Sequence, residues 1–375
     1  MKILIVSMRS IHTIRWVSQL KASGHELYYF DVLDGGYIEK WDSIKQYTSW
    51  RYKFGNFKGR YYLKKKFPRI HELFENNPEK KFEQILEEIK PDLVHSFALK
   101  QGCLPIYNVM KRHHKLAWLY SSWGNDIFNS KGKPTYKEDL EKVLARVDYM
   151  FADCHRDFVM AKGFGFKGEF LGVFPGGGGY NLKQIDSYIK PFNERNIILI
   201  KGYQGKLGRC IQVLQALSAL KEELKNYKLI VFGSHQEVVD YILGNEFDKW
   251  SNFSYHTSLT HEQVLELMGR AKIYIGNNIS DGMPNTLLEA ICSGAYPIQS
   301  NPGLATAEII NNENGALIDD IENIDHISKV ITKVIDDEDL ESGVDYNLNV
   351  VRTKLEYENV KREVLLAYQK IQKNI

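Results

Sequence analysis

Two stretches of this chain read as the start of a parallel β-sheet, and they lie far apart in the sequence. Residues 2–7 form an apolar run that is followed by a loop, a helical pattern over about residues 13–22 and a second strand at 26–30. A run of the same kind at residues 196–200 opens a second series. Because strands that alternate with helices predict parallel sheets covered by helices, we expect two α/β domains.

Length and composition agree with two domains. The chain has 375 residues, enough for two cores, and its 43% hydrophobic and 26% charged residues are ordinary for a globular protein. A formal net charge of +2 does not indicate nucleic acid as a partner. The sequence has no apolar run of about 18 residues, so we expect no membrane-spanning helix.

The cysteines and the first residues indicate a cytoplasmic protein. Four cysteines are widely spaced without a Cys-x-x-Cys or Cys/His pattern, so we expect reduced core residues and no zinc site. The apolar run at the N-terminus is too short for a signal peptide.

Further strands and helices follow from the same apolar periodicity. A glycine-rich stretch at 171–180 lies between the two series, and we take it as the start of the interdomain connection. The predicted strands are 93–96, 116–120, 149–152, 228–232, 272–275 and 295–299, and the main predicted helices of the second half are 208–224, 261–269 and 357–371.

Residues 279–298 form the most informative segment for function. They read as a strand end, a tight loop, a helix and a new strand. Pro284 is suited to the first turn of the helix, and Gly294 is suited to its C-terminal cap. Unpaired N–H groups at a helix N-terminus favour a phosphate, so this loop is a candidate anion site.

Polar side chains gather on one side of that helix. Asn285 and Glu289 are one turn apart on the same face, close to the loop that carries Asp281. A carboxylate one turn into the helix can accept hydrogen bonds from a ribose diol. The segment therefore predicts a site for a nucleotide that carries a polar group, although an ordinary loop-to-helix turn with a surface carboxylate is the plainer alternative.

The segment resembles the acidic-x7-acidic signature of the family-4 retaining glycosyltransferases. That family has the GT-B fold, in which two Rossmann-like domains with parallel sheets face each other across a cleft. The resemblance implies that Asp281 faces the sugar as a catalytic residue and that Glu289 holds the ribose. Asp281 departs from the family, where the first acidic residue is usually Glu, one methylene longer. The donor contacts implied by the resemblance continue through the loop: Gly282, Met283, Pro284, Asn285 and Thr286.

The resemblance also implies a division of the chain. The first domain would bind the acceptor over residues 1–175, and a linker would follow at 176–195. The second domain would bind the nucleotide sugar over 196–355, and a last helix at 356–375 would cross back to the first domain.

The loop after the first strand of the second half combines cations with glycines. Lys201 and Arg209 are candidates to neutralise the diphosphate leaving group as charge develops, and Gly202 and Lys206 are further donor contacts. The loop is not a Walker A loop, because Lys206 is followed by leucine. The family usually has arginine where this chain has Tyr203. Solvated loop cations are the alternative.

His256 lies at a strand end that corresponds to the base-binding position of the family. Backbone groups mostly read the base there, so the side chains do not separate uracil from guanine. We favour UDP over GDP as the donor nucleotide.

Candidate acceptor contacts lie in the first half. His12 and Thr13 follow the first strand, where α/β folds place ligands, although His12 could equally serve the N-cap of its helix. Residues 121–126 resemble the His-Gly-x-Asp segment of the family, with Trp123 in place of the histidine. Trp123 is a candidate sugar platform or a core residue, and Asp126 is a candidate acceptor contact.

Residues 50–69 carry eight basic residues and no acidic residue, with aromatic residues between them. Cations with interfacial aromatics predict contact with an anionic membrane surface or a lipid-linked acceptor. A solvated helix pair with aromatics in the core is the first alternative and nucleic acid the second. The basic residues are Arg51, Lys53, Lys58, Arg60, Lys64, Lys65, Lys66 and Arg69, and the aromatic ones are Trp50, Tyr52, Phe54, Phe57, Tyr61, Tyr62 and Phe67.

The sequence and the resemblance together indicate a retaining, metal-independent glycosyltransferase. It would move a sugar from a nucleotide diphosphate sugar to a hydroxyl of a glycan or lipid-linked glycan, as in bacterial-type surface polysaccharide synthesis. We expect no cofactor and no metal, since the acidic cluster at residues 336–339 reads as a solvated helix end or loop and not as a metal site. We also expect a cytoplasmic location that extends to the inner face of the membrane. A nucleotide-sugar epimerase or hydrolase of the same fold and a non-catalytic carbohydrate-binding protein are the alternatives.

Overall fold

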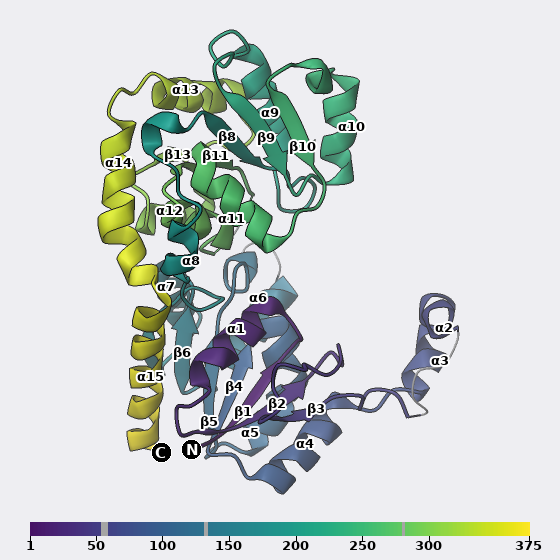
Figure 1. Ribbon diagram of the computed structural model, residues 1–375. Helices are drawn as coiled ribbons and strands as arrows, with labels where there is room; N and C mark the ends of the chain where they lie inside the picture. Colours follow the sequence, from purple (N-terminus) through teal and green to yellow (C-terminus); the bar gives the residue numbers. More distant parts are fainter. Residues whose placement is uncertain (54–58, 131–133, 280–281) are drawn as a thin grey trace. The chain divides into compact units, whose positions relative to one another are not determined.

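The computed structural model describes residues 1–53, 59–130, 134–279 and 282–375. The chain divides into two compact units (Figure 1). The first unit contains Met1–Gly178 together with Arg362–Ile375, and the second contains Gly179–Lys361. Asp281, which was predicted to face the sugar, lies outside the described residues, as do Phe54, Phe57 and Lys58.

The first unit is built on one parallel sheet of seven strands in the order β3-β2-β1-β4-β5-β6-β7. Ile5 in the central strand lies opposite Tyr29 on one side and His95 on the other. The strands are β1 (Lys2–Ser7), β2 (Glu26–Asp31), β3 (Lys45–Tyr47), β4 (Leu93–Phe97), β5 (Ala117–Ser121), β6 (Tyr149–Ala152) and β7 (Glu169–Val173).

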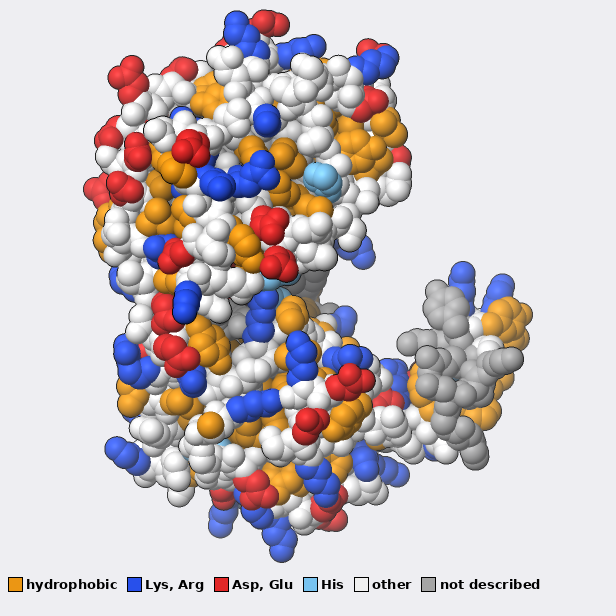
Figure 2. All heavy atoms as spheres, viewed as in Figure 1, with side chains coloured by type: hydrophobic (Ala, Val, Ile, Leu, Met, Phe, Trp, Pro, Cys, Tyr) orange, Lys and Arg blue, Asp and Glu red, His pale blue; other side chains and the backbone are white. Residues whose placement is uncertain are grey.

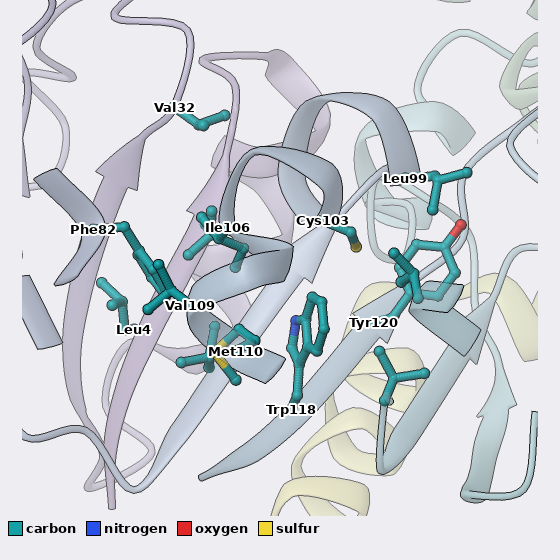
Figure 3. Packing of buried hydrophobic residues seen from close by; sticks show 14 of the residues in the cluster. Leu4, Val32, Phe82, Leu99, Cys103, Ile106, Val109, Met110, Trp118 and Tyr120 are labelled. Carbon is teal, nitrogen blue, oxygen red and sulfur yellow. The ribbon is translucent and has the colours of Figure 1, made fainter. Parts of the chain in front are cut away.

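Helices cover this sheet and bury both of its faces. Strands β4 and β5 are buried along their whole length, as expected for parallel strands between two helical layers. The side chain of Trp118 packs among apolar side chains from the strands and helices (Figure 3). The α-helices of the first unit are α1 (Ile11–Leu20), α2 (Arg60–Lys66), α3 (Pro68–Leu73), α4 (Pro78–Ile89), α5 (Tyr107–Arg112), α6 (Pro134–Leu144), α7 (His155–Gly163) and the larger part of α15 (Tyr357–Asn374).

A buried chain of hydrogen bonds ties the end of the chain to the first sheet. The indole N–H of Trp16 donates to the hydroxyl of Tyr368 (3.3 Å), and this hydroxyl lies 2.6 Å from Nδ1 of His95. His95 Nε2 lies 2.7 Å from the hydroxyl of Ser121. Burial lowers the pKa of His95, so the ring is neutral, and one of its nitrogens donates while the other accepts. Residues 362–375 therefore complete the core of the first unit.

The second unit has a parallel sheet of six strands in the order β10-β9-β8-β11-β12-β13. Its strands are β8 (Ile197–Lys201), β9 (Lys228–Phe232), β10 (Phe253–His256), β11 (Ala271–Gly276), β12 (Tyr296–Ser300) and β13 (Ala316–Ile318). Its helices are α8 (Leu182–Asp186), α9 (Cys210–Ala219), α10 (Gln236–Gly244), α11 (His261–Arg270), α12 (Asn285–Cys292), α13 (Ile324–Ile335) and α14 (Leu340–Tyr346).

The prediction of two α/β domains with parallel sheets is confirmed, but two local predictions were wrong. Helix α9 ends at Ala219 rather than near residue 224. The stretch at 171–180 does not begin as a connection, because its first residues complete strand β7, and the division between the units falls at Gly178 and Gly179. A side chain at Gly179 would place Cβ 2.5 Å from the Cα atom of Tyr357, so only glycine fits there.

The four cysteines are free and buried, as expected. None of the helices in the described ranges has the length and apolar character that a membrane span requires.

Candidate functional site

Helix α12 and the loop before it form the centre of the candidate site. The helix starts at Asn285, and Pro284 is its N-cap with extended backbone (φ −64°, ψ 122°), one residue earlier than the first-turn position predicted for it. Gly282, Met283 and Pro284 are buried. Because proline has no side-chain acceptor, this helix start is not capped by its own N-cap side chain.

The end of α12 is fixed by glycine, as predicted. Gly294 has a left-handed backbone (φ +71°), and its N–H donates to the carbonyl of Ile291 (3.1 Å). The N–H of Ala295 donates to the carbonyl of Ala290 (3.0 Å), which completes a Schellman motif. This cap sets the length of the helix and with it the positions of Asn285 and Glu289.

Glu289 is held by a partner that the sequence did not reveal. Its side chain is only 6% exposed, and Oε1 lies 2.7 Å from Nε2 of His261. His261 is the first residue of α11, directly after Thr260, whose capping box with Gln263 fixes the start of that helix. The capping box was a visible signal for the helix start, but no pattern links residue 261 to residue 289.

Tyrosine hydroxyls orient two further polar side chains, those of Asn285 and Thr286 in the first turn of α12. Asn285 Oδ1 accepts a hydrogen bond from the hydroxyl of Tyr180 (3.1 Å). Thr286 Oγ1 lies 3.0 Å from the hydroxyl of Tyr274. Hydrogen bonds therefore orient Asn285 and Glu289, the two residues of the predicted helix face, and also Thr286.

The loop that follows β8 lies beside the segment that leads into α12. Gly208 forms an antiparallel bridge with Asn278, and the N–H of Ile279 donates to the carbonyl of Leu207 (2.7 Å). A side chain on Gly208 would place Cβ 2.0 Å from the carbonyl oxygen of Tyr203, so the tight fold of this loop requires glycine. The structure thus brings together the two predicted donor-binding segments, which are far apart in sequence.

Gly202 lies where three strand ends meet. Its N–H donates to the carbonyl of Phe232 (2.8 Å), and a Cβ atom there would lie 2.7 Å from the Cα atom of Ser234. The N–H of Ser234 donates to the carbonyl of His256 (2.9 Å). His256, half-buried at the end of β10, therefore belongs to the same edge of the second sheet as the loop.

The three candidate cations differ in their surroundings. Lys201 is 9% exposed, and its ammonium lies 4.6 Å from the ring centre of Tyr203, whereas Lys206 is exposed. Tyr203, which takes the place of the usual arginine, stacks on His235 with ring centres 4.7 Å apart.

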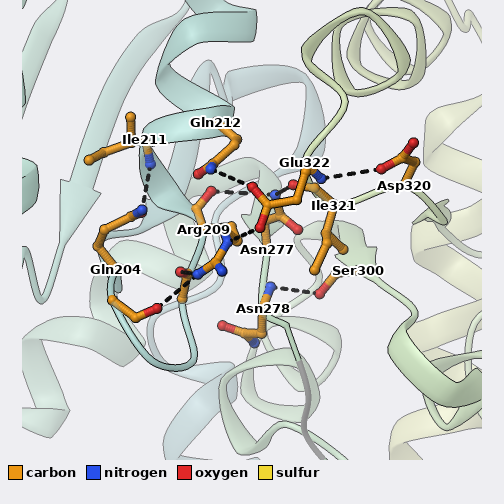
Figure 4. Close-up of polar contacts among 12 residues, drawn as sticks. Gln204, Arg209, Ile211, Gln212, Asn277, Asn278, Ser300, Asp320, Ile321 and Glu322 are labelled. Carbon is orange, nitrogen blue, oxygen red and sulfur yellow. Dashed lines mark hydrogen bonds and ion pairs between the residues drawn. The ribbon is translucent and has the colours of Figure 1, made fainter.

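Arg209 is bound within the protein. Its guanidinium forms an ion pair with Glu322 and donates to the carbonyls of Gly205 (2.8 Å) and Gly208 (2.7 Å) (Figure 4). Gln212 donates to the other carboxylate oxygen of Glu322 (2.7 Å). Glu322 therefore already neutralises Arg209, and a phosphate would have to compete with this carboxylate.

In the first unit, the loop after β1 turns its polar groups inward. Ser10 is the N-cap of α1 and accepts from the N–H of Thr13 (3.1 Å). Thr13 is fully buried, and its hydroxyl donates to the carbonyl of Met8 (2.9 Å). The prediction that His12 is the N-cap partner was therefore wrong, because Ser10 has that role. The hydroxyl of Thr13 is bonded to the backbone of the same loop. His12 contacts Trp123 edge-on, with ring centres 5.9 Å apart.

Asp126 organises the loop that carries Trp123. Its Oδ2 accepts from the N–H of Leu99 (2.8 Å) and from the hydroxyl of Tyr120 (3.1 Å). Burial raises the pKa of Asp126 to about 7, against the opposing effect of these donors. The half-buried Trp123 packs on Phe97 at 4.7 Å between ring centres, so it is part of the core edge and is also partly exposed.

Close to this loop, Asp153, Cys154 and Asp157 bring three potential metal ligands within 4.8 Å of one another. The guanidinium of Arg156 already forms an ion pair with one of these ligands, because its Nη2 lies 2.8 Å from Asp157 Oδ1. The hydroxyl of Ser122 donates to the other oxygen of Asp157 (2.8 Å). Both carboxylate oxygens of Asp157 are thus bound by side chains of the first unit.

Comparison with known proteins gives matches for both units. Residues 2–153 match the model of the family described as glycosyl transferase 4-like, and residues 184–348 match the model described as glycosyl transferases group 1. No curated protein sequence matches the chain.

Many solved structures are similar along nearly the whole chain. Sucrose-phosphate synthase from Thermosynechococcus elongatus is 14% identical over all of both chains, with a TM-score of 0.72. Anabaena Alr3699/HepE, solved with UDP and glucose, is 12% identical, with 98% of this chain and 99% of that chain covered and a TM-score of 0.69. The lipopolysaccharide outer core galactosyltransferase WaaB is 16% identical, with 99% of each chain covered and a TM-score of 0.70. At such identities the likeness establishes a shared fold.

Proposed function

We propose a donor, an acceptor and a stereochemical course for this chain, which belongs to the glycosyltransferases with a 4-like first domain and a group 1 second domain and has the GT-B fold. In this proposal it transfers a sugar from a nucleotide diphosphate sugar to a hydroxyl of a glycan or lipid-linked glycan, with retention of configuration. The observation that carries the proposal is the buried Glu289 on the first turns of α12, next to a helix start that its N-cap side chain leaves uncapped.

The ribose would bind to Glu289. His261 holds Oε1 at 2.7 Å and thereby fixes the carboxylate plane, so that Oε2 can accept hydrogen bonds from the two hydroxyls. A carboxylate that is fixed before binding loses less side-chain entropy when the nucleotide arrives. We therefore assign His261 as a positioning residue.

The diphosphate would lie at the N-terminus of α12, where backbone N–H groups and the helix dipole favour negative charge. Lys201 supplies a buried cation on the neighbouring loop, and Lys206 supplies an exposed one. Arg209 would contribute only after it exchanges Glu322 for a phosphate oxygen. The developing charge of the leaving diphosphate is thus stabilised by fixed donors and cations.

The sugar and the acceptor complete the proposal. Asp281 would contact the sugar hydroxyls. His12 and Trp123 would contact the acceptor, while Thr13 and Asp126 hold the loops that present them. UDP is favoured over GDP because a similar structure, Anabaena Alr3699/HepE, was solved with UDP. The likeness to a lipopolysaccharide outer core galactosyltransferase supports a glycan acceptor in surface polysaccharide synthesis. We propose that the reaction takes place in the cytoplasm.

Nucleotide binding and product analysis test the proposal together. In a thermal-shift screen of UDP, GDP and their sugars, the true ligand at about 100 times its Kd adds roughly 2.7 kcal/mol of stability. With that donor and a glycan acceptor, NMR should show a new glycosidic bond with the donor's anomeric configuration. An inverted product, or binding without turnover, contradicts the proposal. An epimerised or hydrolysed donor that forms without acceptor identifies the epimerase or hydrolase alternative.

Turnover should persist in EDTA, because cations and N–H groups are assigned to the diphosphate. The measurement is the initial rate with and without chelator. A rate abolished by EDTA and restored by magnesium or manganese would contradict the proposed leaving-group site.

A further inference from the structure

The hairpin formed by α2 and α3 is fastened at its base. Tyr52 and Glu75 form an antiparallel bridge, and the N–H of Asn76 donates to the carbonyl of Arg51 (2.7 Å). Arg51 and Glu75 also form an ion pair at 2.8 Å. Just before the base, Trp50 is buried and its indole N–H donates to the carbonyl of Asp31 (2.7 Å). The prediction that counted Trp50 among the interfacial aromatics was therefore wrong, since it anchors the hairpin.

Beyond this base the hairpin exposes large apolar side chains. Tyr62 is 62% exposed, Phe67 50%, Ile70 47% and Leu73 71%. These four residues lie within residues 62–73, whereas an exposed apolar residue elsewhere normally stands alone. Among the residues of this stretch whose side chains are described, only His71 is buried, and its ring centre lies 5.9 Å from that of Tyr52. The hairpin is too small to bury its own apolar residues.

Cations share the same surface. Lys65, Lys66 and Arg69 are exposed, and none of the three forms an ion pair with a described residue. The acidic residues nearby are Glu72, which is exposed, and Glu75, which Arg51 neutralises. Figure 2 shows blue and orange side chains together on the hairpin.

We propose that the α2–α3 hairpin, through Tyr62, Lys65, Lys66, Phe67, Arg69, Ile70 and Leu73, docks the protein on an anionic lipid surface. A bilayer interface offers anionic headgroups to the cations and an apolar layer to Phe67, Ile70 and Leu73 at the same time. A second copy of the chain would bring the same cations against each other. Nucleic acid would pair with the cations but would leave aliphatic side chains such as Leu73 in water.

The inference does not depend on the transfer reaction, because it concerns residues outside the donor site. The test is therefore co-sedimentation of the full chain with vesicles, without substrate. Vesicles of phosphatidylcholine alone are compared with vesicles that also contain phosphatidylserine. Binding should require phosphatidylserine and weaken from about 50 to about 500 mM salt as the charges are screened.

Two sets of hairpin variants, each with its own control set, separate charge from apolar contact. Lys65→Ser, Lys66→Ser and Arg69→Ser together should lower vesicle affinity about 100-fold, since each basic residue near the surface contributes about 1 kcal/mol. Ile70→Ser with Leu73→Ser should weaken binding while leaving its salt dependence in place. The control for charge is Lys40→Ser, Lys115→Ser and Lys167→Ser, three exposed lysines elsewhere in the first unit. The control for apolar contact is Leu33→Ser with Val159→Ser, also exposed.

Measurements of folding and of vesicle binding together decide the proposal. Unchanged circular dichroism and nucleotide thermal shift show that a variant is folded, so loss of vesicle binding alone supports the inference. It is overturned if the wild-type chain ignores anionic vesicles at low salt, or if the control variants lose as much affinity as the hairpin variants. Binding to a DNA duplex in place of vesicles, or concentration-dependent dimers that the hairpin variants abolish, would also overturn it.

Discussion

The two helices that follow a central strand, α1 in the first unit and α12 in the second, begin in opposite ways. Helix α1 is closed by its own residues, because Ser10 caps the N–H of Thr13 and the hydroxyl of Thr13 lies 2.9 Å from that of Ser7. Helix α12 begins at Asn285, and its N-cap residue, Pro284, has no side-chain acceptor for the first N–H groups. A strand-to-helix turn can thus either cap the first N–H groups of the helix with its own side chain, as in α1, or lack such a cap, as in α12.

The acidic residues of the two units repeat this contrast. Asp126 accepts two hydrogen bonds at Oδ2, from the backbone N–H of Leu99 and from the buried hydroxyl of Tyr120. Glu289 is held at one oxygen by His261. The two buried carboxylates thus differ in their partners, because Asp126 is bound to buried groups of its own unit, whereas His261, the partner of Glu289, is 49% exposed.

The largest effect should come from neutralising Glu289, the proposed ribose ligand. Glu289→Gln should weaken nucleotide binding by about 1–3 kcal/mol, because a charge-assisted hydrogen bond becomes neutral. Titration calorimetry with UDP and GDP measures the change. Glu266→Gln, an exposed glutamate on α11, serves as the control. Equal affinities for Glu289→Gln and wild type would remove Glu289 from the site and abolish the contrast with Asp126.

Asp126 should instead affect the pH dependence of stability. Its pKa is raised to about 7 in the folded protein from an ordinary value of 3.8, so the native state binds the proton more tightly. The stability from this proton is complete below about pH 3.8 and is lost as pH rises towards 7, by at most about 1.4 kcal/mol per pH unit. Asp126→Asn keeps the acceptor oxygen and removes the titration.

The comparison is made by urea unfolding at about pH 5 and about pH 7. Five of the six tryptophans lie in the first unit, so fluorescence follows mainly this unit. Wild type should lose more stability than Asp126→Asn over this interval. Parallel changes in the two proteins would show that Asp126 does not titrate there.

Exchanging the helix caps tests the comparison directly. Pro284→Ser gives α12 a side-chain cap that competes with a phosphate, so UDP affinity should fall by about 1 kcal/mol. Ser10→Ala should lower the stability of the first unit by about 1 kcal/mol and leave UDP affinity unchanged. Tighter UDP binding by Pro284→Ser would mean that the phosphate does not use this helix start.

The smallest effect is expected at His261. His261→Ala should weaken nucleotide binding by about 0.5–1.5 kcal/mol, the usual contribution of one hydrogen bond, and His261→Gln should recover part of it. A double-mutant cycle with Glu289→Gln separates positioning from folding. If the effects of the two changes simply add, His261 does not act through Glu289.

Local signals in the sequence predicted most of what surrounds these helices. The apolar strands and the glycine after α12 were readable because each depends on a few neighbouring residues. Strands β3 and β13 were missed because three residues carry too little pattern. The pairs Arg209–Glu322 and His261–Glu289 join residues 113 and 28 positions apart, and nothing in a single sequence marks such partners.

The place of Tyr368 beneath the first sheet has a consequence for how the chain is made. Residues 1–178 leave the ribosome before the second unit, yet the hydroxyl that lies between Trp16 and His95 is synthesised only after the second unit. Domains usually fold in the order of their synthesis. Here the N-terminal part of the first unit lacks this partner of His95 until translation of the second unit is complete.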